Sequence, residues 1–169
     1  MLLLAGWSIV ATLLAAGSHA VPAATPIVTR VRPASVEIGD LLADAARRSA
    51  TVRQLLARLE VTDAIVYVEL TASPQIPTAR TTLVTSTPGA RFIRIGINAG
   101  TLSGDRAPLL GHELQHALEI AEHVEIHDER TVRALYGRIG RARGPDAFET
   151  DAAKSIESSV RAELRMKGR

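Results

Sequence analysis

Apolar residues recur every three or four positions from Ile38 to Leu59, which is the spacing of helices with one buried face. The pattern is interrupted near Ser49, where Ser-Ala-Thr can cap a second helix. The next apolar run, Ala64 to Leu70, is short and rich in β-branched residues, so it predicts a strand. Two more strand-like runs flank Pro88 and Gly89, which predicts a hairpin. The first half of the chain therefore predicts two helices followed by a small antiparallel sheet.

The second half predicts three helices. The first begins with Ser103 or Asp105 as its N-cap and continues through a histidine-rich stretch. The second covers DERTVRALYGRIG and ends near Gly140, and the third covers DAFETDAAKSIESSVRAEL. This last helix is amphipathic through Ala152, Ile156, Val160 and Leu164. Helices, a small sheet and then more helices predict an α+β fold.

The stretch GHELQHALEIAEH contains the candidate chemistry. A helix advances about 100° per residue, so His112 and His116 project from one face and can share one metal ion. Glu113 lies about 100° round the helix from His112, where it can reach a water on that metal. The alternative is a helix whose histidines hold no metal.

HELQH resembles the HExxH signature of the zincin metallopeptidases, and the resemblance is strong from Leu109 to Leu118. The resemblance implies Zn²⁺ bound by His112 and His116, Glu113 as the general base, and a peptide or protein substrate. The rest of the chain matches that family only in layout. Two other interpretations are a structural zinc scaffold with a fourth protein ligand and a helical cell-envelope interaction protein without metal.

A catalytic zinc site needs a third protein ligand. The candidates are Glu122, His123, His127, Asp128, Glu149 and Asp151. His123 lies about 10 Å along an unbroken helix from His116, too far for a shared ion. The metzincin pattern, a glycine and then a third histidine, is not present, because Glu119 and Glu122 occupy those positions.

Glu149 is the third ligand that a resemblance to the gluzincins implies. In that group the ligand is a glutamate on a later helix that packs against the active-site helix. A small residue often follows three positions on, where the two helices pack, as Ala152 does here, so the resemblance implies that the final helix packs on the histidine-rich one. The match is partial, because Ala153 stands where the gluzincins often have Asp or Asn. Asp151 is a candidate to orient a ligand histidine.

Two further features bear on substrate binding. The run from Arg91 to Asn98 precedes the motif helix, as does the edge strand on which zincins hold extended peptides, although a core strand is an equal alternative. Tyr136 is the only tyrosine after the motif. It is a candidate donor to the tetrahedral oxyanion, and a packing role is the alternative.

The N-terminal segment predicts export. Residues 1–20 contain no Asp, Glu, Lys or Arg and end in small residues, which predicts a signal peptide cleaved after Ala20 and a periplasmic or secreted protein. An uncleaved N-terminal anchor is the alternative, and no stable membrane span is expected after cleavage. Residues 21–34 contain three prolines and predict an extended linker, so that the domain covers residues 35–169.

Composition narrows the chemistry. The absence of cysteine excludes thiolate zinc ligands and disulfides, so any zinc must use histidine and carboxylate. A net charge of +2 is too slight to argue for nucleic acid, and five aromatic residues in all are few for base stacking.

Overall fold

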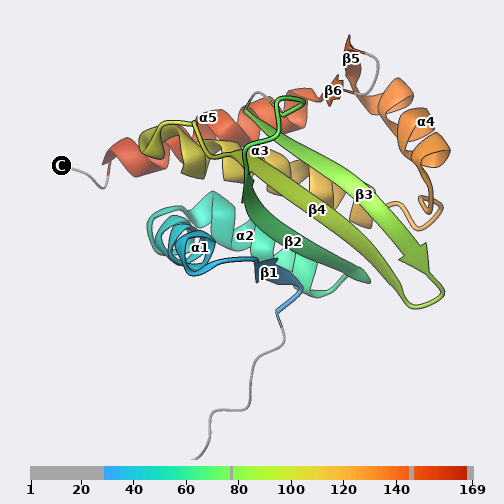
Figure 1. The fold of residues 1–169 in the computed structure, drawn as a ribbon, viewed down its shortest axis with the longest axis horizontal. Helices are drawn as coiled ribbons and strands as arrows, with labels where there is room; N and C mark the ends of the chain where they lie inside the picture. The colour runs from blue at the N-terminus through green and yellow to red at the C-terminus, as the bar shows by residue number, and fades with distance from the viewer. Residues whose placement is uncertain (1–28, 77, 145–146, 167–169) are drawn as a thin grey trace, which may run out of the picture.

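The computed structural model describes residues 29–76, 78–144 and 147–166 (Figure 1). Its elements are, in chain order, β1 (Val31–Pro33), α1 (Val36–Arg48), α2 (Ala50–Glu60), β2 (Ala64–Thr71), β3 (Ala79–Thr87), β4 (Ala90–Asn98), α3 (Ser103–Ala121), α4 (Glu129–Ile139), β5 (Arg141–Gly144), β6 (Ala147–Glu149) and α5 (Asp151–Met166). The predicted α+β class is confirmed. None of the helices among these residues is long and apolar enough to cross a membrane.

The main sheet is mixed rather than antiparallel, so this part of the prediction is wrong. Its order is β1-β2-β4-β3, with β1 and β4 parallel to β2 and β3 antiparallel to β4. The hairpin of β3 and β4 turns so that β4 inserts beside β2. Ile93, Ile95 and Ile97 of β4 are fully buried. A strand this apolar is most stable at the centre of the sheet, where both of its edges are paired. The strand from Arg91 to Asn98 is therefore central, and β3 lies at the edge of the sheet beside it.

The folded sheet begins before the predicted boundary at residue 35. Val31–Pro33 forms β1, which pairs in parallel with Val66–Val68 of β2. The second half of the predicted linker thus includes a strand. The predicted signal peptide, residues 1–20, lies outside the described residues.

One face of the sheet carries the core. In the parallel register Val66 lies beside Ile93 and Val68 beside Ile95, so these buried side chains share a face. Helix α3 packs against β3 and β4 of the sheet, and it also contacts α2 and α5, which flank it in Figure 1. The motif helix is therefore enclosed on several sides, which holds its side chains in fixed positions.

Gly111 permits the close packing of α3 and α5. A Cβ atom at this position would lie 2.8 Å from Val160 Cγ2, closer than two carbon atoms can approach. The sequence prediction assigned this role to Ala152, but Ala152 is exposed and Ala153 is buried instead. The predicted helical phase was therefore wrong by one residue at the start of α5.

Arg91 anchors the C-terminal end of α3. Its side chain is 3% exposed, and the guanidinium donates to the carbonyl oxygens of Ile120, Ala121 and His123 and also pairs with Asp63. A cation at a helix C-terminus satisfies carbonyls that lack intrahelical partners and interacts favourably with the helix dipole. Strand β4 thereby fixes the end of the motif helix.

Candidate metal centre

The motif helix places its two histidines side by side in a buried position. His112 and His116 are one turn apart in α3, and their ring centroids are 4.9 Å apart with the rings nearly perpendicular. Both are buried, as is Glu113 between them in sequence. The i, i+4 spacing therefore turns both imidazoles toward the same point, as expected from helix geometry.

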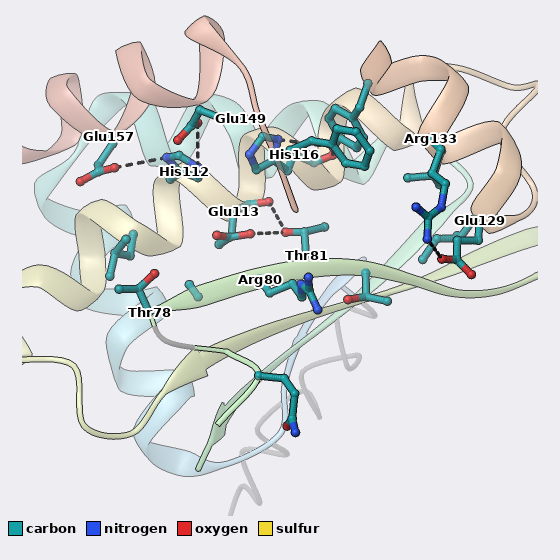
Figure 2. Close-up of a pocket in the computed structure, with 18 residues that line it drawn as sticks. Thr78, Arg80, Thr81, His112, Glu113, His116, Glu129, Arg133, Glu149 and Glu157 are labelled. Carbon is teal, nitrogen blue, oxygen red and sulfur yellow. Dashed lines mark hydrogen bonds and ion pairs between the residues drawn. The ribbon is translucent and has the colours of Figure 1, made fainter. Parts of the chain in front are cut away.

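Glu149 reaches the same point from another element. Its Oε1 lies 3.4 Å from His112 Nε2, and one ligand atom from each of His112, His116 and Glu149 lies within 4.8 Å of the other two. Figure 2 shows Glu149 above His112 and beside His116. The structure thus brings together the three predicted ligands. Glu149 ends strand β6 and precedes α5, so it lies on a hairpin and not on the final helix as predicted.

The other candidates for a third ligand lie elsewhere. Glu122 pairs with Arg58, Asp128 caps the N-terminus of α4, and His123 Nδ1 bonds the carbonyl of Glu119. His127 is exposed, and its backbone N–H donates to Thr131. Asp151 is 80% exposed and faces Arg141 at 3.7 Å, so it orients neither histidine.

Two of the three ligand candidates, His116 and Glu149, fit a metal ion by their unpaired atoms. Among the described residues, His116 Nε2, Glu149 Oε1 and His112 Nδ1 are the buried side-chain atoms without a hydrogen-bond partner. An unpaired buried polar atom costs about 1–3 kcal/mol, and a divalent cation among the first two would remove that cost. Two imidazoles and one carboxylate form a set that zinc accepts in catalytic sites.

Glu113 points away from the two histidines and toward the edge strand. Thr81 of β3 donates from its Oγ1 to Glu113 Oε2 at 2.7 Å (Figure 2). Burial raises the pKa of Glu113, and this effect outweighs the nearby histidines and the bond from Thr81, which act in the opposite direction. A carboxylate with a raised pKa holds a proton more readily, which suits a general base that must later act as an acid.

Each histidine has a carboxylate on its Nδ1 side. His116 Nδ1 lies 2.8 Å from Glu119 Oε2 in a hydrogen bond. His112 Nδ1 lies 3.2 Å from Glu157 Oε2, at ion-pair distance but without hydrogen-bond orientation, and Glu157 is held by Arg161. The desolvation of His116 lowers its pKa, but the bond with Glu119 and the neighbouring carboxylates raise it more.

Sequence reasoning missed both carboxylates. Glu119 is three residues after His116 and therefore on the same helix face, a spacing that could have suggested the contact. Glu157 is far from the motif in sequence, so only the packing of α5 on α3 brings it to His112.

Tyr136 packs against His116 near its Nδ1. The phenol donates to the carbonyl of His116 at 3.2 Å and lies 3.4 Å from its Nδ1, and the ring stacks on Phe148. Burial raises the pKa of Tyr136 well above its ordinary value, so its hydroxyl remains a donor. These contacts are those of a buried packing residue. The catalytic role of Tyr136 stays a prediction.

A cavity of about 600 Å³ opens in front of the candidate centre. The edge strand β3 forms one wall, α4 another, and the side chains of the centre form the base, as Figure 2 shows. The lining residues include Thr81, Glu113, His116, Arg133 and Glu149. Glu113 and the three ligand candidates therefore face the same cavity.

Comparisons with protein-family models, with curated proteins and with solved structures each found no significant match to this chain.

Proposed function

We propose that this chain is a zinc-dependent metallopeptidase of the HExxH type, with His112, His116 and Glu149 as metal ligands and Glu113 as the general base. The observation that carries the proposal is the convergence of three ligand atoms within 4.8 Å of one another at the base of an open cavity. Glu113 lines the same cavity, but its carboxylate accepts a hydrogen bond from Thr81, so it is not one of the proposed metal ligands.

Zinc, when bound, supplies a Lewis acid and lowers the pKa of a coordinated water toward neutrality. The chain's own residues do the rest. Glu113 takes a proton from the water that attacks the substrate carbonyl and delivers it to the departing amide nitrogen. Thr81 holds one carboxylate oxygen of Glu113 and so fixes the direction from which the proton is taken.

The edge strand supports a peptide as substrate. Of the described strands, β3 ends the main sheet on the side of the cavity, and Ala79 to Leu83 line that cavity. An extended peptide can add to such an edge by backbone hydrogen bonds. The role first assigned to Arg91–Asn98 thus passes to β3, whose Thr81 contacts Glu113 directly.

Zinc binding is the first test. Metal-free protein is titrated with zinc, and we expect one equivalent for wild type and none for His112→Ala, His116→Ala or Glu149→Ala, because two ligands make a poor site. Asp151→Ala and His123→Ala are matched controls from the rejected candidates and should bind as wild type does. Zinc retained in a ligand variant, or lost in a control, contradicts the ligand assignment.

Peptide hydrolysis is the second test. Glu113→Gln should keep its zinc and lose about 10²–10⁴-fold in the rate of cleavage of a quenched fluorescent peptide library. Wild type that binds zinc and cleaves no peptide would instead indicate a non-catalytic zinc-binding protein. Wild type without zinc would leave a helical interaction protein as the better interpretation.

A further inference from the structure

Glu119 is a buried carboxylate that the proposed reaction does not use. It lies on α3 one turn after His116 and is 7% exposed. Its two oxygens have different partners. Oε2 bonds His116 Nδ1 at 2.8 Å, while Oε1 accepts from Thr150 Oγ1 at 2.8 Å and from Gln115 Nε2 at 3.3 Å. A side chain this buried and this fully bonded has one fixed orientation.

The bonds of Glu119 determine which nitrogen of His116 carries the proton. An ionised carboxylate only accepts hydrogen bonds, so His116 Nδ1 must be the donor. In the neutral ring Nε2 then has a free lone pair. Nε2 is also the atom of His116 that is buried without a partner. Glu119 therefore selects the tautomer that a metal ion requires.

Thr150 extends this contact to the third ligand. Its hydroxyl donates to Glu119 and accepts from the backbone N–H of Ala153 at 3.0 Å, which caps the start of α5. Thr150 directly follows Glu149 in the chain and is 3% exposed. The orientation of Glu119 thus fixes both the ring of His116 and the backbone that carries Glu149.

We infer that Glu119 is the positioning residue of the metal centre, joining His116 on α3 to Glu149 at the junction of β6 and α5 through Thr150. This inference rests on the proposed function for the identity of the ligands. It assigns to Glu119 the role that the sequence suggested for Asp151. Carboxylates in this position raise the metal affinity of a ligand histidine, typically by 10–100-fold.

Glu119→Gln tests the role with little change in shape. The amide nitrogen must face either His116 Nδ1 or the donors Thr150 and Gln115, so one of the two links is lost. Competition with a chromophoric chelator should show zinc affinity about 10–100-fold weaker than wild type. Glu125→Gln, at an exposed carboxylate outside the centre, should bind as wild type does. Unchanged affinity in Glu119→Gln overturns the inference.

Two substitutions at Thr150 test the same link between Glu119 and Glu149 if Glu119→Gln fails to fold. Thr150→Val keeps the shape and removes the hydroxyl, so zinc affinity should fall, while Thr150→Ser retains the hydroxyl and should restore it. A purely structural role would instead make the two variants differ in unfolding midpoint without any difference in zinc affinity at a temperature where both are folded. That outcome contradicts the link to Glu149.

The tautomer of His116 is measured without metal. Long-range ¹H–¹⁵N correlation spectra of metal-free wild type, at a pH where the ring is neutral, should show the proton on Nδ1. A proton on Nε2 overturns the inference. Because this readout needs no zinc, it separates failure of the Glu119 assignment from failure of the proposed function, which a wild type unable to bind zinc would reveal.

Discussion

Gly111→Ala perturbs the contact that brings α5 against the motif helix. The added Cβ would lie 2.8 Å from Val160 Cγ2 and 3.5 Å from Ile156 Cγ2, whereas ordinary contact begins at 3.4 Å. The two helices must therefore separate by about half an ångström at the residue next to His112. Because Val160 is fully buried and Gly111 lies in mid-helix, side-chain movement alone gives little relief.

The expected magnitude is the difference of two effects. Overpacking of a core contact costs about 1–3 kcal/mol, and replacing a helical glycine by alanine gains about 1 kcal/mol. The net loss for Gly111→Ala should be about 1 kcal/mol. Val160→Ala alone should cost about 2 kcal/mol by leaving a cavity. In the double variant the new methyl group occupies that cavity, so the pair should be at least about 1 kcal/mol more stable than the sum of the single effects predicts.

Urea unfolding of the metal-free proteins measures these free energies through their midpoints. Gly137→Ala is the matched control, because it is also a helical glycine and a Cβ there would meet nothing within 4 Å. It should stabilise the protein by about 0.5–1 kcal/mol. If Gly111→Ala stabilises the protein as much as Gly137→Ala, or if the double variant is additive, then the close approach of α3 and α5 is wrong.

Three further predictions concern other parts of the molecule. Arg91→Met should destabilise the protein by about 3 kcal/mol, because buried carbonyls at the end of α3 lose their donor, whereas Arg94→Met on the same strand, at an exposed side chain, should change stability by less than about 0.5 kcal/mol in urea unfolding. Burial alone would raise the pKa of Glu163, but hydrogen bonds from Ser49 and Thr51 at the start of α2 lower it below the ordinary value for a glutamate. A pKa that is lower in the folded state than in the unfolded chain stabilises the protein at pH values above the unfolded-state pKa. This contribution is lost as the pH falls through the folded-state pKa. Glu163→Gln should therefore lower the melting temperature at neutral pH, and the difference from wild type should shrink in acid; a constant difference would contradict this. If residues 1–20 are a signal peptide, N-terminal sequencing of the mature protein should find Val21 first, following cleavage after Ala20, whereas an intact Met1 on a membrane fraction would favour an N-terminal anchor.

Local spacing along the chain determined the helices and the motif. The break between α1 and α2 falls at Ser49, whose side chain caps the second helix as the sequence indicated. His112 and His116 share a face because their four-residue spacing is a property of any helix. The choice of Glu149 came from a family resemblance rather than from geometry, and the fold places it beside both histidines.

The tertiary structure alone decided the strand order and the surroundings of the ligands. The hairpin of β3 and β4 was visible in the sequence, but its insertion beside β2 depends on long-range pairing between strands. Thr150 and Glu157 reach Glu119 and His112 only because α5 packs on α3 at Gly111, where the missing side chain sets the distance. A hydrogen bond between residues far apart in the chain has no periodic signal in the sequence, because its partners are chosen by the packing of whole elements.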